Sequence, residues 1–351
     1  SLVFPALADW PEDWAFYPAS TMNAWLSNFI VDWATVIAKL KALSFFYLML
    51  PVKIGLERTV SPFSWGFELT TVHAIGYAVI AAALAAYAFA RKGAAAAVAA
   101  AFFAIVLYFG LTGLPWAAFI AMATYLAWQL GGRNLAIGTC AGFAFLLLAG
   151  VWPQSMLSIY LCGIAVALSF FIGSAIGIAA SEIDWVSAIM RPINDTLQTM
   201  PQFVILIPFV MIFKIGDFTA LLAIVAYAIV PAIRYAEHGL RSLPRDVIEA
   251  ATCMGCTRWQ LLWQVKLPLA LPVIMLGLNQ TIMYGLAMLV IAALVGTSGL
   301  GQQVYIGLGD GDFGVGIVAG LGMAIIAMIA DRMTQAWSRS RQEAFGLDHR
   351  A

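Results

Sequence analysis

The sequence predicts an all-α, polytopic membrane protein that crosses the bilayer about 8–10 times, and three observations support this prediction. Hydrophobic residues make up 63% of the 351 residues and charged residues only 10%, whereas a soluble domain has about 25% charged residues. Three long stretches, 93–132, 134–181 and 267–309, contain no Asp, Glu, Lys or Arg. Their apolar runs are continuous rather than alternating, which favours helices over barrel strands.

Apolar runs of suitable length predict the membrane helices in order along the chain. They lie at about 71–90, 94–111, 114–130, 135–151, 155–180, 201–213, 219–233, 269–295 and 315–330. The run 201–213 is short alone, and we expect it to extend back through 192–200. The run 42–56 is short and broken by Pro51, so an interfacial helix and a crossing fit it equally well. Residues 1–40 mix Trp, Pro and acidic residues, which is typical of an aromatic-rich surface segment.

The charge balance and the missing motifs argue against several other classes of protein. The 18 basic and 18 acidic residues cancel, which leaves no electrostatic footprint for a nucleic-acid partner. The sequence has no Gly-Lys dipeptide and therefore no phosphate-binding G-x-x-x-x-G-K-[ST] loop. We expect no catalytic residue, no metal site and no cofactor in this chain. Any pumping would then draw its energy from another polypeptide.

Lys and Arg residues in short loops predict the orientation of the helices. The loop between the last two helices carries only Asp310 and Asp312, so we expect it to face outward. Counting membrane crossings backward from this loop places Arg133 and the Arg91–Lys92 pair on the cytoplasmic side. The segment 234–266 and the C-terminal tail, both expected to be cytoplasmic, carry the remaining clusters: Arg234, Arg241, Arg245, Arg258, Lys266, Arg332, Arg339, Arg341 and Arg350.

Three pairs of glycines have the G-x-x-x-G spacing that lets membrane helices approach closely: Gly138/Gly142, Gly173/Gly177 and Gly316/Gly320. Chance is the alternative, because Gly is common in membrane helices. We expect packing at each pair, and none of them identifies a function.

The segment 234–266 is the longest charged stretch between apolar runs, and it looks helical in two pieces. Residues 245–251 suit a first helix, and Gly255 then breaks the chain or packs tightly. Thr257 is a candidate N-cap of a second helix, which Leu267–Pro268 is expected to end. Such a helix–turn–helix would present a compact surface to a partner, although an amphipathic surface helix with no partner fits the pattern equally well.

This segment matches the EAA signature of ABC importer permeases, which reads E-A-A, three residues, G, nine residues and I-x-L-P. Every spacing is met, with Val265 where Ile is usual. The chain therefore resembles that family, in which this loop is the coupling helix that docks on the ATPase subunit. The resemblance implies that the contact is formed by Glu249, Ala250, Ala251, Gly255, Val265, Leu267 and Pro268. Glu249 would pair with a basic residue of the ATPase or cap a neighbouring helix.

The resemblance covers about 155–341 and is most specific to the glycine betaine/proline betaine/choline permeases. The stretches that carry it are 198–201, 208–211, 267–272, 277–281, 299–302 and 331–332, with Met200 and Phe209 as departures. It implies import of betaine-like quaternary ammonium compounds, and trimethylamine N-oxide is a close alternative on chemistry. The implied domains are an N-terminal interfacial segment (1–60), additional helices (61–153), a five-helix permease core (154–341) and a cytoplasmic tail (342–351).

The resemblance also implies partners and a location. One chain carries one coupling loop, so the simplest assembly is a homodimer with two ATPase subunits, which would bind the ATP and Mg. Because the chain begins at Ser1, a processed product or a longer chain carrying both halves is the alternative. A separate extracytoplasmic protein would bind the substrate, and the permease would lie in the bilayer of a bacterial cytoplasmic (inner) membrane.

Polar side chains near the predicted helices are candidates for the pathway or its gate. They are Gln198, Thr199, Met200, Pro201, Asn279, Gln280 and Thr281, and helix–helix hydrogen bonding is the alternative role. A secondary transporter without an ATPase is the second functional hypothesis, although such transporters usually need ionisable groups at membrane depth. A membrane-bound enzyme or a scaffold is a third.

Overall fold

A computed structural model describes residues 19–53, 71–113 and 116–344, and these residues form helices and no strand. The first helices are α1 (Ala19–Asp32), α2 (Ala34–Leu43), a π-helical turn (Ser44–Met49), α3 (Leu50–Lys53), α6 (Thr71–Lys92), α7 (Ala94–Gly113) and α8 (Trp116–Leu148). The rest are α9 (Trp152–Glu182), α10 (Asp184–Thr199), α11 (Gln202–Phe213), α12 (Asp217–Arg241), α13 (Arg245–Cys253), α14 (Arg258–Gln260), a second π-helical turn (Leu261–Lys266), α15 (Leu267–Ala292), a 3-10 turn (Ala293–Val295), α16 (Leu300–Gly309) and α17 (Phe313–Ala344). The predicted boundary at 60/61 and residues 345–351 of the tail lie outside the described residues.

The all-α, polytopic fold class is confirmed. Six helical stretches in the described ranges are long and apolar enough to cross a membrane, with Ala34–Lys53 among them and α8 counted as one, and the bent pair α10–α11 would be a seventh. Helices α6 and α7 add shorter apolar stretches, at Ile75–Ala90 and Ala94–Tyr108.

Helix α8 contains a sharp reversal, so it holds two helices rather than one. Gly132, at φ +74°, is the non-helical residue within it. The rings of Phe119 and Phe143 pack edge to face with centroids 5.2 Å apart, whereas a straight helix would separate these residues by about 36 Å. The sequence prediction of two helices, 114–130 and 135–151, agrees with this hairpin.

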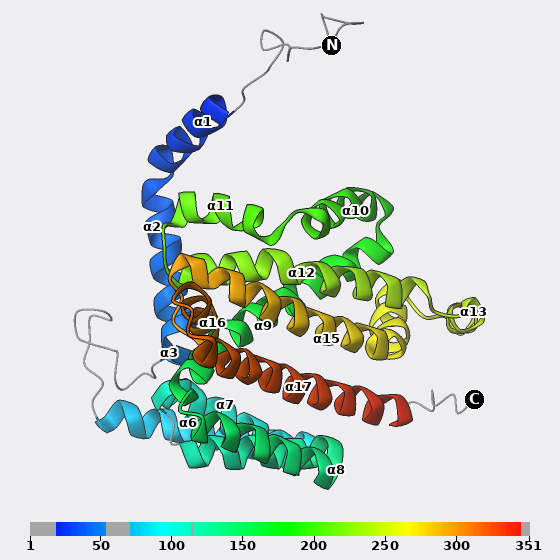
Figure 1. The fold of residues 1–351 in the computed structure, drawn as a ribbon. Helices are drawn as coiled ribbons and strands as arrows, with labels where there is room; N and C mark the ends of the chain where they lie inside the picture. The colour runs from blue at the N-terminus through cyan, green and yellow to red at the C-terminus, as the bar shows by residue number, and fades with distance from the viewer. Residues whose placement is uncertain (1–18, 54–70, 114–115, 345–351) are drawn as a thin grey trace, which may run out of the picture.

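Helix α12 packs against both α9 and α15, and these two helices also contact each other (Figure 1). Helices α9 and α12 come close because glycines remove side chains from the contact. An added Cβ at Gly173 or Gly177 would lie 2.7 Å from the Cβ of Ala232 or Ala236, respectively. The prediction of close packing is therefore confirmed for this pair of glycines.

The other two glycine pairs pack at one member only. Gly142 and Gly316 lie against atoms of neighbouring helices, whereas an added Cβ at Gly138 or Gly320 would meet no neighbouring atom within 4 Å. The spacing prediction is thus wrong for Gly138 and Gly320, because a G-x-x-x-G spacing clears one helix face but does not supply a second helix to fill it.

The bundle has two ends, and we call the end beside α13 the α13 end. At the α13 end, α12 finishes, α15 begins and α17 runs toward the C-terminus (Figure 1). The reversal in α8 is also there, since an added Cβ at Gly131 would lie 3.2 Å from the Cβ of Ala336 in α17. The basic residues Arg133, Arg332 and Arg339 therefore gather at the α13 end, as the predicted topology requires.

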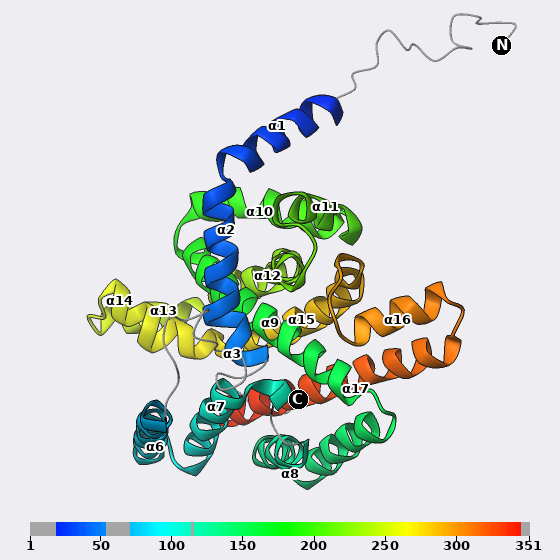
Figure 2. The ribbon, with the colours of Figure 1, turned by 90° about the vertical axis from the view of Figure 1, so that its left-hand side faces the viewer.

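The segment α2–α3 crosses the opposite end of the bundle rather than running alongside α12. Figure 2 looks onto that end and shows α2 in front of the core helices. Lys41 donates to the carbonyl of Phe213 at 3.0 Å, and Lys53 pairs with Asp217 at 2.6 Å. Both acceptors lie at or beside the start of α12. The placement across the end of the bundle fits an interfacial helix, whereas the length and composition of Ala34–Lys53 fit a crossing, so both alternatives for the 42–56 run stay open.

Three local predictions were wrong. Residues 192–213 do not form one helix: α10 and α11 meet at an angle of 102°, because Pro201 forces Met200 into an extended conformation (ψ 135°). Leu267–Pro268 does not end a helix either. The π-helical turn before it tolerates the missing N–H of Pro268, so the helix continues from Arg258 to Val295. Helix α16 occupies part of the stretch between 295 and 315, where the sequence predicts only a loop.

Candidate functional site

The α13 loop (residues 242–266) projects from the bundle between α12 and α15 (Figure 1). Pro244 precedes α13, and Asp246 in its first turn favours the positive end of the helix dipole. Leu262 at the root of the loop and Leu267 at the start of α15 pack against a buried apolar cluster that α12 and α15 form together. The loop is therefore held by both helices that flank it.

Gly255 ends α13 through a two-bond C-terminal cap. It adopts φ +83°, its N–H donates to the carbonyl of Thr252, and the N–H of Cys256 donates to the carbonyl of Ala251. This is the Schellman arrangement, in which a left-handed residue reverses the chain and satisfies the last carbonyls. The spacing of four residues between Ala251 and Gly255 is thus the spacing that this cap requires, and the prediction that Gly255 breaks the helix is confirmed.

The Glu249-Ala250-Ala251 motif faces two ways. Glu249 and Ala250 are exposed, whereas Ala251 is 8% exposed and packs inward. Within the described residues Glu249 makes no hydrogen bond or ion pair, so it does not cap a neighbouring helix of this chain there. Its carboxylate remains available to a partner.

Thr257 is the N-cap of the second helix, as predicted. Its hydroxyl accepts from the N–H of Gln260, and the side-chain oxygen of Gln260 accepts from the N–H of Thr257 at 2.9 Å. Val265, Leu267 and Pro268 are half-buried at the junction with α15. They lie in the stem of the loop rather than on its exposed surface.

Three large apolar side chains on the surface of the loop were not predicted from the sequence. Met254, Trp259 and Trp263 are 86%, 71% and 58% exposed. The signal that could have found them is the i, i+4 spacing of the two Trp residues on a segment with polar neighbours. Apolar side chains gathered on a projecting loop are typical of a docking surface.

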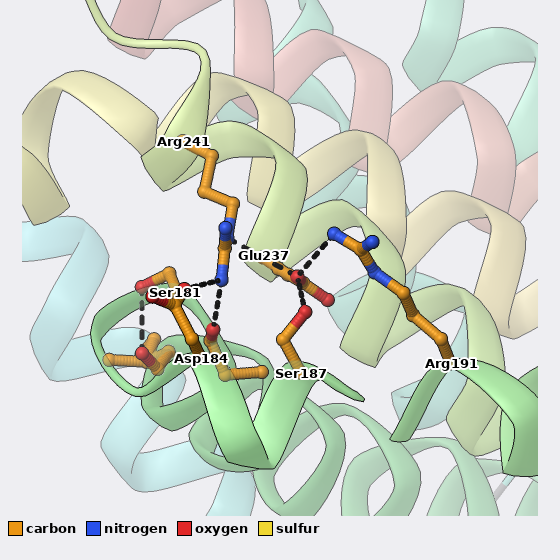
Figure 3. Close-up of polar contacts among 8 residues, drawn as sticks. Ser181, Asp184, Ser187, Arg191, Glu237 and Arg241 are labelled. Carbon is orange, nitrogen blue, oxygen red and sulfur yellow. Dashed lines mark hydrogen bonds and ion pairs between the residues drawn. The ribbon is translucent and has the colours of Figure 1, made fainter. Parts of the chain in front are cut away.

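A charged cluster at the α13 end was also missed, because only Arg241 among its members was considered from the sequence, and it served to assign topology. Glu237 of α12 accepts from the hydroxyl of Ser187 at 2.6 Å and pairs with Arg241 at 3.3 Å (Figure 3). Arg241 donates to Asp184 at 3.1 Å, and Arg191 lies 3.8 Å from Glu237. The cluster joins α12 to the start of α10.

The candidate pathway residues lie in two separate places. Gln198, Thr199, Met200 and Pro201 form the bend between α10 and α11, and Thr199 bonds to carbonyls of its own helix. Asn279, Gln280 and Thr281 lie midway along α15, where Thr281 bonds to the carbonyl of Gly277. No hydrogen bond of the described residues joins the two groups, so their role in a pathway stays a prediction.

The described ranges contain no group of three or more His, Cys, Asp or Glu side chains that could hold a metal ion. The C-x-x-C at Cys253 and Cys256 has both thiols free.

Comparison with known proteins places the same part of the chain in one family. Residues 169–342 match the family described as "Binding-protein-dependent transport system inner membrane component". The glycine betaine/proline betaine transport system permease protein ProW of Escherichia coli is 38% identical over 229 residues, 65% of each chain. The glycine betaine transport system permease protein OpuAB of Bacillus subtilis is 39% identical over 226 residues, which are 64% of this chain and 80% of that protein.

A third relative is the trimethylamine N-oxide transport system permease protein TmoV of Pelagibacter ubique. It is 36% identical over 236 residues, which are 67% of this chain but 33% of that protein. The chain thus spans just under two thirds of the E. coli relative and one third of the Pelagibacter relative.

Proposed function

Since the chain belongs to the family of binding-protein-dependent transport system inner membrane components, in the betaine branch of the ABC importer permeases, we propose that it is the permease subunit of an ATP-driven importer. Like its family it is a multi-pass inner membrane protein. The observation that carries the proposal is the α13 loop, a capped helix with an exposed acidic and apolar surface at the end of two packed core helices.

The proposed partner at this surface is a separate ATPase subunit, which binds ATP and Mg. Glu249 would pair with a basic residue of that subunit, and Met254, Trp259 and Trp263 would pack in its groove. Each chain offers one such loop, so two copies of the permease serve two ATPase subunits in the proposed homodimer. The positive-inside distribution of Lys and Arg supports a cytoplasmic location for the α13 end.

The proposed mechanism uses two states of the permease. ATP closes the ATPase dimer, the α13 loop moves with it, and α12 and α15 turn the permease outward; hydrolysis returns it inward. The bend between α10 and α11 and the polar middle of α15 are the proposed gate. Broken helices with polar residues are where membrane transporters commonly place such sites.

The proposed substrates are betaine-like quaternary ammonium compounds and methylated amines, including glycine betaine, proline betaine, choline and trimethylamine N-oxide. Relatives named for glycine betaine and for trimethylamine N-oxide support this chemical class. Affinity would lie mainly in a separate extracytoplasmic binding protein, and the charge-free stretches 134–181 and 267–309 suit a weakly binding path.

The test is substrate uptake and ATP hydrolysis by the complete complex, co-purified with its ATPase and binding protein and reconstituted in vesicles. Wild type should import glycine betaine only when ATP is supplied, and Glu249→Lys should hydrolyse ATP without import. Glu343→Lys, at the C-terminal end of α17, is the charge-matched control and should behave as wild type. Uptake without ATP would support a secondary transporter instead, and unchanged transport by Glu249→Lys would contradict the docking role.

A further inference from the structure

We propose that the corner between α9 and α10 (Ala180–Ser187) is the joint through which the α13 loop moves the bent pair α10–α11. In this proposal Glu182, Asp184 and Ser187 are positioning residues for coupling. The inference rests on the proposed function, because it concerns how motion of the loop reaches the helices of the pathway.

The first observation is that both stems of the α13 loop bind this one corner. Arg241, the last residue of α12, donates to the carbonyl of Ala180 at 2.8 Å and to Asp184 at 3.1 Å (Figure 3). Lys266, the last residue before α15, donates to Glu182 at 2.6 Å. The loop is therefore attached at its entry and at its exit to the same few residues.

The second observation is a bond to the first turns of α10 itself. Ser187 is 3% exposed and donates to Glu237 at 2.6 Å, while Arg241 and Arg191 flank the same carboxylate (Figure 3). The side chain of Glu237 is only 12% exposed. Ion pairs and hydrogen bonds are less screened in such a site than at the open surface, so this contact fixes the start of α10 firmly on α12.

The third observation is that α10 has few other attachments, the remaining ion pair to α12 among the described residues being that of Asp195 with Arg234. It is a helix of 16 residues, about 24 Å long, in which only Ser187 and Asn194 are fully buried. Its two ends are non-helical points, Ile183 in an extended conformation and the bend at Met200–Pro201. A helix bounded by two non-helical points follows what is attached to it, and α10 is attached to α12 at the polar corner and through the pair of Asp195 and Arg234.

These observations give a mechanical connection with a defined order. Movement of the α13 loop shifts Arg241 and Lys266 together, because they are the two stems of the loop. The corner follows both stems, α10 turns about Ile183, and the bend at Met200–Pro201 is displaced. The ion pair of Glu182 with Lys266 needs opposite charges on its two residues, but either residue can carry either sign. Exchanging the two charges should therefore preserve the connection.

The experiment is a charge exchange in the reconstituted complex with its ATPase and binding protein. The readout is the number of ATP molecules hydrolysed per glycine betaine imported, which a change in protein amount alone does not move. Glu182→Lys and Lys266→Glu should each raise this ratio about fivefold or more, in the range of ordinary coupling between sites. The double variant should return it to near the wild-type value.

Ser187→Ala supplies a milder variant that keeps every charge. It should raise the ratio, whereas Ser181→Ala should not, since Ser181 lies in the same corner but donates only to the carbonyl of Ile178 in its own helix. Wild-type ratios in Ser187→Ala and in both single charge variants would overturn the inference, as would a double variant that is no better than the singles. If the wild-type complex itself imports without ATP, the proposed function fails instead.

Discussion

The contact between α9 and α12 at Gly173 offers a direct test of how the bundle is packed. An added Cβ at Gly173 would lie 2.7 Å from the Cβ of Ala232, whereas ordinary contacts begin at 3.4 Å. The carbonyl of Ile229, 2.9 Å away, cannot rotate aside. Gly173→Ala therefore requires the two helices to separate by about 0.7 Å, the difference between 3.4 and 2.7 Å.

The size of the effect follows from two opposing terms. Overpacking a close contact costs about 1–3 kcal/mol of the free energy of unfolding. Replacing Gly by Ala within a helix raises the free energy of unfolding by up to about 1 kcal/mol. Gly138→Ala is the matched control, because Gly138 is also helical but has nothing within 4 Å of an added Cβ. The gain from replacing Gly by Ala in a helix is the same in both variants. The difference between their free energies of unfolding therefore measures the overpacking cost, about 1–3 kcal/mol.

The assay is thermal unfolding of the purified protein in detergent, followed by helical circular dichroism. Gly173→Ala should melt below Gly138→Ala by a few degrees, at about 2–4 °C per kcal/mol. Gly173→Val should lower the melting temperature further, because its larger side chain forces the helices farther apart. Equal melting temperatures for Gly173→Ala and Gly138→Ala would refute the close approach of α9 and α12.

Three further predictions concern other parts of the chain. Gly255→Val should abolish coupled import, because a β-branched residue at φ +83° costs about 1–2 kcal/mol or more and opens the cap of α13. Gly93→Val is the control, since Gly93 has φ +82° and equally open surroundings and so carries the same strain. This control should leave the number of ATP molecules hydrolysed per substrate imported unchanged. Asp217→Asn removes the carboxylate that pairs with Lys53, so limited proteolysis should cut the α2–α3 segment faster than in wild type; an unchanged rate would argue against attachment of that segment through this pair. Phe119→Cys combined with Phe143→Cys should be joined by a short bifunctional thiol reagent, since the two rings are 5.2 Å apart, and failure to cross-link would argue for a straight α8.

Much of the local structure could be predicted from the sequence because it depends on residues that are close together in the chain. The cap at Gly255 and the capping box of Thr257 each involve residues within five positions. Hydrophobic run length likewise sets which segments can be membrane helices. The bend at Met200–Pro201 was missed because the apolar run to its C-terminal side looked too short to stand alone.

The charged corner could not be found in the same way. Lys266 and Glu182 are 84 residues apart, and Arg241 and Asp184 are 57 apart. A charge at a helix end has no periodic pattern that identifies its partner, so from the sequence Arg241 and Lys266 indicate only orientation. Their pairing depends on how α9, α12 and α15 are placed relative to one another.

By itself the sequence determined the all-α membrane class, the α13 loop with its capped helix and the family to which the chain belongs. Only the tertiary structure decided which glycines meet a second helix, that α2–α3 crosses the bundle, and that both stems of the loop hold one corner. The physical reason is the range of the interactions. Propensity, capping and hydrophobic run length act within a few residues, whereas the sites of close packing and ion pairing exist only after distant helices have been brought together.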